Sequence, residues 1–99
     1  MTINVAREFE LVTLEITGRL DTTTAPNLEA VINEISEDTK ELIFNMAELE
    51  YISSAGIRVL LSAYKKMNQS GGILRIEKAN DIVREVFEMT GLLEMLNQE

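Results

Sequence analysis

The sequence predicts a single α/β domain with a four-stranded mixed sheet, an N-terminal β-hairpin, three main helices and a short C-terminal helix. Two observations lead to this fold class. Apolar residues alternate at period two near the N-terminus and recur at helical spacing in three later segments. Short apolar runs of strand length separate those helical segments. Strands that alternate with helices are typical of crossover connections, so the inner strands are expected to be parallel.

The first third of the chain predicts a hairpin and then a helix. Ile3 and Val5 alternate with polar neighbours, and after a polar break the run 12–16 alternates again until Gly18. A helix follows, with Thr24 as its cap and Pro26 in the first turn, where a missing N–H is tolerated. Its apolar residues recur at i, i+3, i+4 and i+7, at Leu28, Val31, Ile32 and Ile35.

The remaining chain predicts two more strands and two more main helices. The apolar run within 41–46 suits a strand covered on both faces, and 73–77 is the fourth strand. The helix between them stops at the Ser-Gly-Gly of 70–72. Its inner face is formed by Ile57, Leu60, Leu61, Tyr64 and Met67. A third helix opens at Asn80 and Asp81 and ends at Gly91, with an inner face of Ile82, Val83, Val86 and Phe87. A short closing helix is expected from Leu92, Leu93 and Leu96.

The composition excludes several kinds of chemistry. Ninety-nine residues are enough for one hydrophobic core, so a single domain over 1–99 is expected. The chain has no cysteine and no histidine. Disulfides, thiolate nucleophiles, Ser-His-Asp triads and cysteine-ligated metal centres are therefore excluded. An active site would have to use carboxylates, Lys or Tyr alone.

The charge and hydropathy patterns bear on partners and location. A net charge of −8 disfavours binding to nucleic acid and to anionic membranes. It would steer the chain towards a partner with a basic patch, although acidic composition is also common among bacterial cytoplasmic proteins. No stretch approaches the roughly 20 apolar residues of a membrane span, and the N-terminus lacks the apolar core of a secretory signal. We expect a cytoplasmic monomer.

Residues 51–61 join a strand to an amphipathic helix through small side chains. Ser53 and Ser54 stand at the junction and are followed by Ala55 and Gly56. At the start of a helix, unpaired N–H groups and the helix dipole favour an anion such as a phosphoryl group. Serine is also among the best N-cap residues, so either serine could be present only as a cap. Gly56 could likewise serve only close packing of the helix on a strand.

The chain resembles the STAS family over essentially its whole length, and within it the bacterial anti-sigma factor antagonists. Four segments carry the resemblance: Gly18-Arg19-Leu20-Asp21 before a helix, Leu42-Ile43-Phe44-Asn45-Met46, the segment from Tyr51 to Leu60, and Phe87-Glu88-Met89-Thr90-Gly91-Leu92. The fold is therefore expected to be STAS-like.

The resemblance implies a partner-switching cycle that regulates transcription. The unphosphorylated domain binds an anti-sigma factor that is also a serine kinase, and so releases a sigma factor. The kinase phosphorylates the junction serine, and a metal-dependent serine phosphatase reverses the modification. ATP and magnesium belong to those partners, so this chain is expected to need no cofactor and not to be an enzyme.

The resemblance also implies the site. Alignment on Gly56 makes Ser54 the phosphorylation site and Ser53 the second choice, although the family often has Asp in place of Ser53 and Ser or Thr in place of Ala55. The implied partner-binding residues are Asp21, Thr22, Thr24, Ser53, Ser54, Ala55, Gly56, Ile57 and Arg58. A phosphoryl group would add about −1.5 to −2 charge to a surface expected to include Asp21, Glu48 and Glu50. Asp21 could instead only accept backbone N–H bonds in the turn before the first helix.

Two other functions compete with this interpretation. A STAS adaptor that is not phosphorylated would hold a permanent partner in a transport or signalling complex through the same helix face. A hydrolase with Ser54 as nucleophile would need a lysine base, because histidine is absent. Lys65 and Lys66 lie about 15 Å or more further along the helix and are expected on its solvated face, which disfavours catalysis.

Overall fold

The computed structural model describes residues 1–91, which fold into five strands and three helices. In chain order the elements are β1 (Thr2–Glu8), β2 (Leu11–Leu20), α1 (Ala25–Asn33), β3 (Glu41–Asn45), β4 (Leu49–Ile52), α2 (Ser54–Gln69), β5 (Ile73–Glu77) and α3 (Asp81–Thr90). The predicted α/β class and the N-terminal hairpin are confirmed. The short helix expected at Leu92, Leu93 and Leu96 lies outside the described residues.

The strands form one mixed sheet in the order β1-β2-β3-β5, with β4 paired to β2 off this path. β1 and β2 are antiparallel, whereas β2–β3, β3–β5 and β2–β4 are parallel pairs, as expected for crossover connections. β2 pairs with β3 through residues 11–15 and with β4 through residues 18–20. The register shifts between Gly18 and Arg19, where the positive φ of Gly18 (99°) suits glycine.

Within the described residues the sheet has five strands rather than the predicted four. The additional strand, β4, is four residues long, and its two buried residues, Leu49 and Ile52, do not alternate with the exposed pair between them. The period-two pattern is therefore missing. β4 exists because the end of β2 offers it a pairing partner, which is a tertiary effect.

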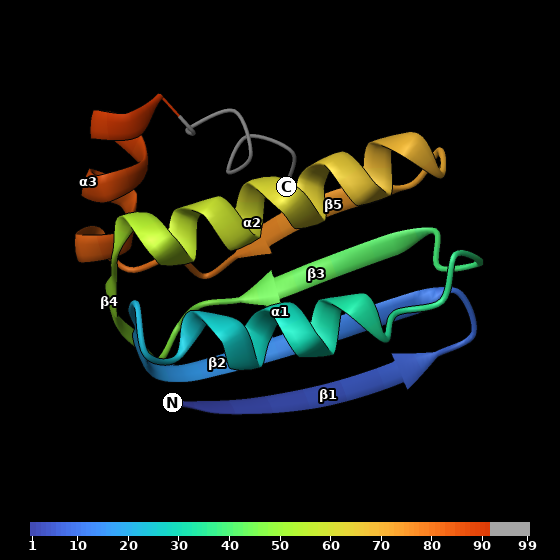
Figure 1. Cartoon of the computed structure of the whole chain (residues 1–99), viewed down its shortest axis with the longest axis horizontal. Coiled ribbons are helices and arrows are strands. Elements are labelled where there is room, and N and C mark those ends of the chain that lie inside the picture. The colour runs from blue at the N-terminus through green and yellow to red at the C-terminus, as the bar shows by residue number, and fades with distance from the viewer. Residues whose placement is uncertain (92–99) are drawn as a thin grey trace.

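The domain has two layers, the sheet and a pair of helices: α1 and α2 lie side by side over one face of the sheet (Figure 1). Between the layers, the largest fully buried side chains include Leu14 and Ile16 of β2, Phe44 of β3 and Leu60 of α2. The helices begin at the same end of the sheet, and α3 packs beside β4 at that end. This end collects the carboxyl termini of the parallel strands.

The third helix packs by a narrower stripe than predicted. Val83 and Phe87 are fully buried and Val86 is partly buried against the core. Ile82 is 57% exposed, so its assignment to the inner face was wrong. α3 therefore contacts the domain through Val83, Val86 and Phe87, while Ile82 lies in solvent. Among residues 1–91, no helix has both the length and the apolar character needed to cross a bilayer.

Candidate functional site

Two strand-to-helix junctions meet at the carboxyl end of the sheet. β2 leads into α1 through residues 21–24, and β4 leads into α2 through Ser53. Because β2 and β4 are parallel neighbours, both junctions leave the sheet at the same edge. The N–H of Ser53 donates to the carbonyl of Leu20 at 2.9 Å. The turn that starts at Asp21 and the junction at Ser53 are therefore adjacent.

The first junction is closed by the side chain of Asp21. Its carboxylate accepts hydrogen bonds from the hydroxyl of Thr23 at 2.8 Å and from the N–H groups of Thr23 and Thr24 at 3.0 and 3.2 Å. The Thr23 hydroxyl lowers the pKa of Asp21 most; partial burial opposes this, and the bonds from Thr24 and the Thr23 N–H lower the pKa further. Asp21 thus accepts backbone N–H bonds in the turn before α1, as one of its two predicted roles required. Its other predicted role, contact with a partner, stays a prediction.

Thr24 stands at the N-cap position of α1, but its side chain does not cap the helix. The prediction that Thr24 is the cap was therefore wrong for its side chain. Its backbone is in the αR region (φ −100°, ψ −20°) rather than in the extended conformation of a usual cap. Its hydroxyl instead donates to the carbonyl of Arg19 and accepts from the N–H of Asp21, both at 2.8 Å. The hydroxyl is used to close the turn, so it is not available to the helix.

The second junction separates the two serines. Ser53 is extended (φ −97°, ψ 174°) and its hydroxyl oxygen accepts the N–H of Gly56 at 3.4 Å, which makes Ser53 the N-cap of α2. Ser54 is the first residue of the helix and is exposed. Its hydroxyl makes no hydrogen bond to any of residues 1–91. Of the two candidate acceptors, one is used structurally and the other is free on the surface.

Gly56 holds the start of α2 against both strands. A Cβ at this position would lie 2.6 Å from Cγ of Leu20 and 3.1 Å from Cγ1 of Ile52. Those residues end β2 and β4, so the missing side chain lets the helix approach the very edge where the junctions meet. Ala55 and Ile57 are partly buried and pack on the core. These three predicted partner-binding residues therefore also support the position of Ser54.

A shallow groove between α1 and α2 borders the second junction. It encloses about 390 Å³, and its lining includes Thr22, Glu29, Ala55 and Arg58. The structure thus brings together three of the predicted partner-binding residues from two segments of the chain. Arg58 is exposed and forms no ion pair with residues 1–91. The groove offers a partner one basic and one acidic side chain beside the exposed Ser54.

The acidic groups expected around the site form two separate groups. Asp21 adjoins the junction and lies 3.8 Å from the guanidinium of Arg19, which also covers the ring of Tyr51 at 4.3 Å from its centroid. Glu48 and Glu50 line a different hollow of about 670 Å³, beside Arg19 and the start of α3. Arg19 was not among the predicted site residues, although its place in the Gly18–Asp21 motif next to the turn was a usable signal.

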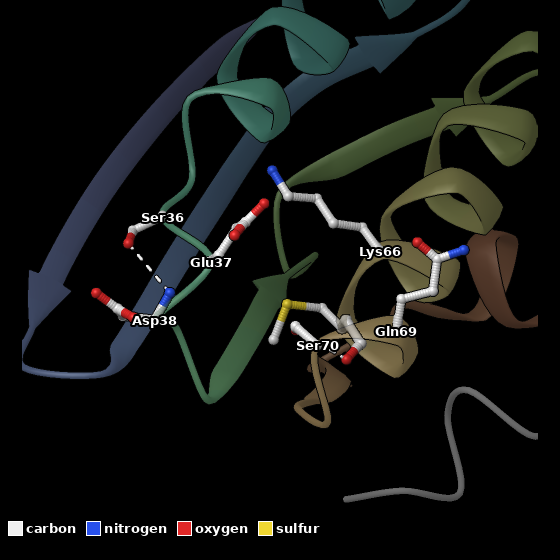
Figure 2. A pocket seen from close by; sticks show the side chains of 7 residues that line it. Ser36, Glu37, Asp38, Lys66, Gln69 and Ser70 are labelled. Carbon is white, nitrogen blue, oxygen red and sulfur yellow. Dashed lines mark hydrogen bonds between the residues drawn. The ribbon is translucent and has the colours of Figure 1, made fainter.

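A further pocket of about 430 Å³ lies at the far end of α2 and contains none of the predicted site residues (Figure 2). Lys66 reaches from α2 into this region, and its Nζ donates to the carbonyls of Ile32 and Ile35 at 2.8 and 3.0 Å. The expectation that Lys66 lies on a solvated face was therefore wrong. In the described part of the chain, no group of three or more acidic residues is placed to hold a metal ion.

Comparisons with known proteins identify the family and support the fold. The model of the STAS domain family matches residues 2–98. The anti-sigma-B factor antagonist of Staphylococcus aureus (strain NCTC 8325 / PS 47) is 29% identical over 85 residues, which are 85% of this chain and 79% of that protein. The unphosphorylated anti-sigma factor antagonist SpoIIAA has a TM-score of 0.86 at 20% identity, covering 96% of this chain and 85% of its own. The phosphorylated form of SpoIIAA, a Bacillus cell fate determinant, has a TM-score of 0.78 at 19% identity, covering 96% and 88%.

Proposed function

Because the chain belongs to the STAS domain family, we propose that it is an anti-sigma factor antagonist whose binding is switched off by phosphorylation of Ser54. In this cycle the unphosphorylated protein binds an anti-sigma factor with serine kinase activity and so releases a sigma factor in the cytoplasm. The kinase then modifies Ser54, and a metal-dependent serine phosphatase restores the binding form. The protein acts by binding and needs no cofactor of its own.

The observation that carries this proposal is the different use of Ser53 and Ser54. A kinase needs a hydroxyl that it can reach and that is not required to hold the fold. Ser54 is exposed, and its hydroxyl has no hydrogen bond within residues 1–91. The hydroxyl of Ser53 is the cap of α2. The function of the S. aureus relative and the existence of a phosphorylated SpoIIAA support the same interpretation.

Local electrostatics would make the phosphoryl group an effective off-signal. It would add about −1.5 to −2 charge next to the groove between α1 and α2. Asp21 adjoins the junction and Glu29 lines the groove, so the added charge would meet carboxylates of the same sign. A partner that covers this surface would have to desolvate the dianion, at a cost that rises with burial. The complex would weaken without any change of fold.

Phosphate mapping tests the proposal directly. The full chain is incubated with ATP, magnesium and the candidate kinase encoded beside its gene, and intact-mass spectrometry then counts the phosphates. The wild type and Ser53→Ala are expected to gain one phosphate, and Ser54→Ala none. Binding of the kinase to each form, measured by isothermal titration calorimetry, is expected to be lost only when Ser54 is phosphorylated.

The controls separate the alternatives. The kinase must be shown to be active on another antagonist, so that a negative result concerns this chain. Loss of the phosphate only in Ser53→Ala would keep the switch and move its site by one residue. No phosphate at all, with a stable complex between the two proteins, would refute the switch and support a constitutive adaptor.

A further inference from the structure

We propose that the guanidinium of Arg58 forms an ion pair with the phosphoryl group when Ser54 is phosphorylated, an inference that rests on the proposed site of modification. Ser54 is the first residue of α2, and Arg58 follows four residues later on the same helix. Side chains at i and i+4 stand on one face of a helix, with their Cβ atoms about 5–6 Å apart. Both residues are exposed, so a guanidinium and a phosphoryl group can meet without displacing any core residue.

The charge order along the helix favours this pair. An anion four residues before a cation is the more stabilising arrangement on a helix. Arginine presents its N–H groups as a planar fork that matches two phosphate oxygens at once. Within residues 1–91 no carboxylate forms an ion pair with Arg58, so the guanidinium does not have to leave such a partner.

Three charged side chains lie around Ser54 and its groove. Glu29 of α1 lines the groove together with Arg58 and is the carboxylate that competes for its guanidinium. Asp21 adjoins the junction through the hydrogen bond between Ser53 and Leu20, so its carboxylate would repel a phosphoryl group on Ser54. Arg58 is the cation on the same helix face. Repulsion from Asp21 and attraction to Arg58 both direct the phosphoryl group along α2 and over the mouth of the groove.

The pair would change the groove in two ways at once. It would place the phosphoryl group over the surface that a partner must cover, and it would remove Arg58 as an available cation. The summed charge of the Ser54 and Arg58 side chains would change from about +1 to between about −0.5 and −1, since the phosphoryl group adds about −1.5 to −2. The modification would thus mask the basic contact as well as add an acidic one.

The test uses phosphoserine incorporated at position 54 during translation of the full chain, so that no kinase is involved. Phosphorus NMR follows the second ionisation of the phosphoryl group in the wild type and in Arg58→Gln, Arg58→Lys and Lys65→Gln. Lys65→Gln is the matched control, because it removes the same charge from an exposed position that lies about 16 Å from Ser54 along the same helix. In addition, the side-chain Nε–H resonance of Arg58 is compared with and without the phosphoryl group.

We expect Arg58→Gln to raise the second pKa of the phosphoryl group by about 0.2 to 0.4 unit, a factor of about 1.5 to 2.5 in the dissociation constant, and Lys65→Gln to leave it unchanged. Arg58→Lys should restore part of the difference, and the Arg58 Nε–H resonance should move on phosphorylation. Equal values in the wild type and Arg58→Gln, with an unmoved resonance, would overturn the inference. A chain that no kinase modifies would refute the proposed function but would not affect this result.

Discussion

The turn from β2 into α1 and the turn from β4 into α2 leave the same edge of the sheet, yet they use their hydroxyl groups differently. In the first turn the hydroxyls of Thr23 and Thr24 are bonded within the turn, to the Asp21 carboxylate and to the Arg19 carbonyl. In the second, Ser53 makes one long capping bond at 3.4 Å and Ser54 makes none within residues 1–91. The first turn uses its threonine hydroxyls in internal hydrogen bonds, whereas the second leaves one serine hydroxyl accessible.

The comparison shows how an accessible hydroxyl can be placed on the surface without holding the fold together. The Asp21 turn and the glycine contact at Gly56 hold the edge of the sheet. Ser54 sits on that support, and its hydroxyl makes no hydrogen bond within residues 1–91. A modification of Ser54 can therefore change the surface while the fold below it stays the same.

The largest expected effect comes from Gly56→Ala, which would separate the two junctions. The new Cβ would lie 2.6 Å from Cγ of Leu20, a fully buried side chain that cannot move into solvent. Overpacking of this kind costs about 1–3 kcal/mol, more than alanine returns in helix propensity. Urea unfolding followed by circular dichroism measures the loss. Ser62→Ala, on an exposed part of the same helix, is the matched control and should unfold with the wild type. Equal stability of Gly56→Ala and the wild type would show that the contact is not tight.

A smaller effect distinguishes the two serines. Ser53→Ala removes the cap of α2 and is expected to cost about 0.5–1 kcal/mol, the lower part of the usual range because the bond is long. Ser54→Ala removes a hydroxyl without a bond and should change the free energy of unfolding by less than about 0.5 kcal/mol. The same urea experiment measures both variants. The opposite order of stabilities would mean that Ser54 is the cap and Ser53 the free hydroxyl.

The smallest effect concerns the first turn and appears only in acid. The pKa of Asp21 is lowered from its usual 3.8 in the folded protein, mainly by the Thr23 hydroxyl. Its ionised form therefore stabilises the fold above the unfolded-state pKa, and this contribution is lost as pH falls through the lower folded-state value. The difference in melting temperature between the wild type and Asp21→Asn should stay constant above about pH 5 and shrink below 3.8.

Thr23→Ala serves as the control for the acid experiment, because it removes the largest cause of the lowered pKa. In that background the pH-dependent part of the Asp21→Asn difference should become smaller. A difference that stays the same from pH 6 to pH 2.5 would contradict the assignment of the turn to the charged carboxylate.

Much of the fold could be predicted because it depends on neighbours in the chain. The hairpin follows from alternation, β3 and β5 from short apolar runs, and the ends of α2 and α3 from Ser-Gly-Gly and Gly91. The position of the candidate site was also predictable, since small residues between a strand and a helix mark such a junction. The structure adds that the β2–α1 turn and the groove residues Thr22 and Arg58 lie at the same place.

Other features depend on residues that are distant in sequence, so local pattern could not reveal them. β4 forms because a bulge at Gly18 lets the end of β2 accept a second parallel neighbour. Lys66 bonds to carbonyls of Ile32 and Ile35, more than thirty residues earlier, only because α1 and α2 lie side by side. Thr24 left its expected capping role because the carbonyl of Arg19 lies within reach in the folded turn.

The sequence by itself determined that this protein has an α/β fold with a pair of serines at a strand–helix junction, and the resemblance of its motifs to the STAS family indicated the kind of α/β fold. Periodicity and turn residues are local properties, and they survive in the unfolded chain. Only the tertiary structure decided which serine caps α2 and which is exposed. That choice depends on where β4 ends and the helix begins, and the pairing of β4 with β2 and the contact of Gly56 with Leu20 set that boundary.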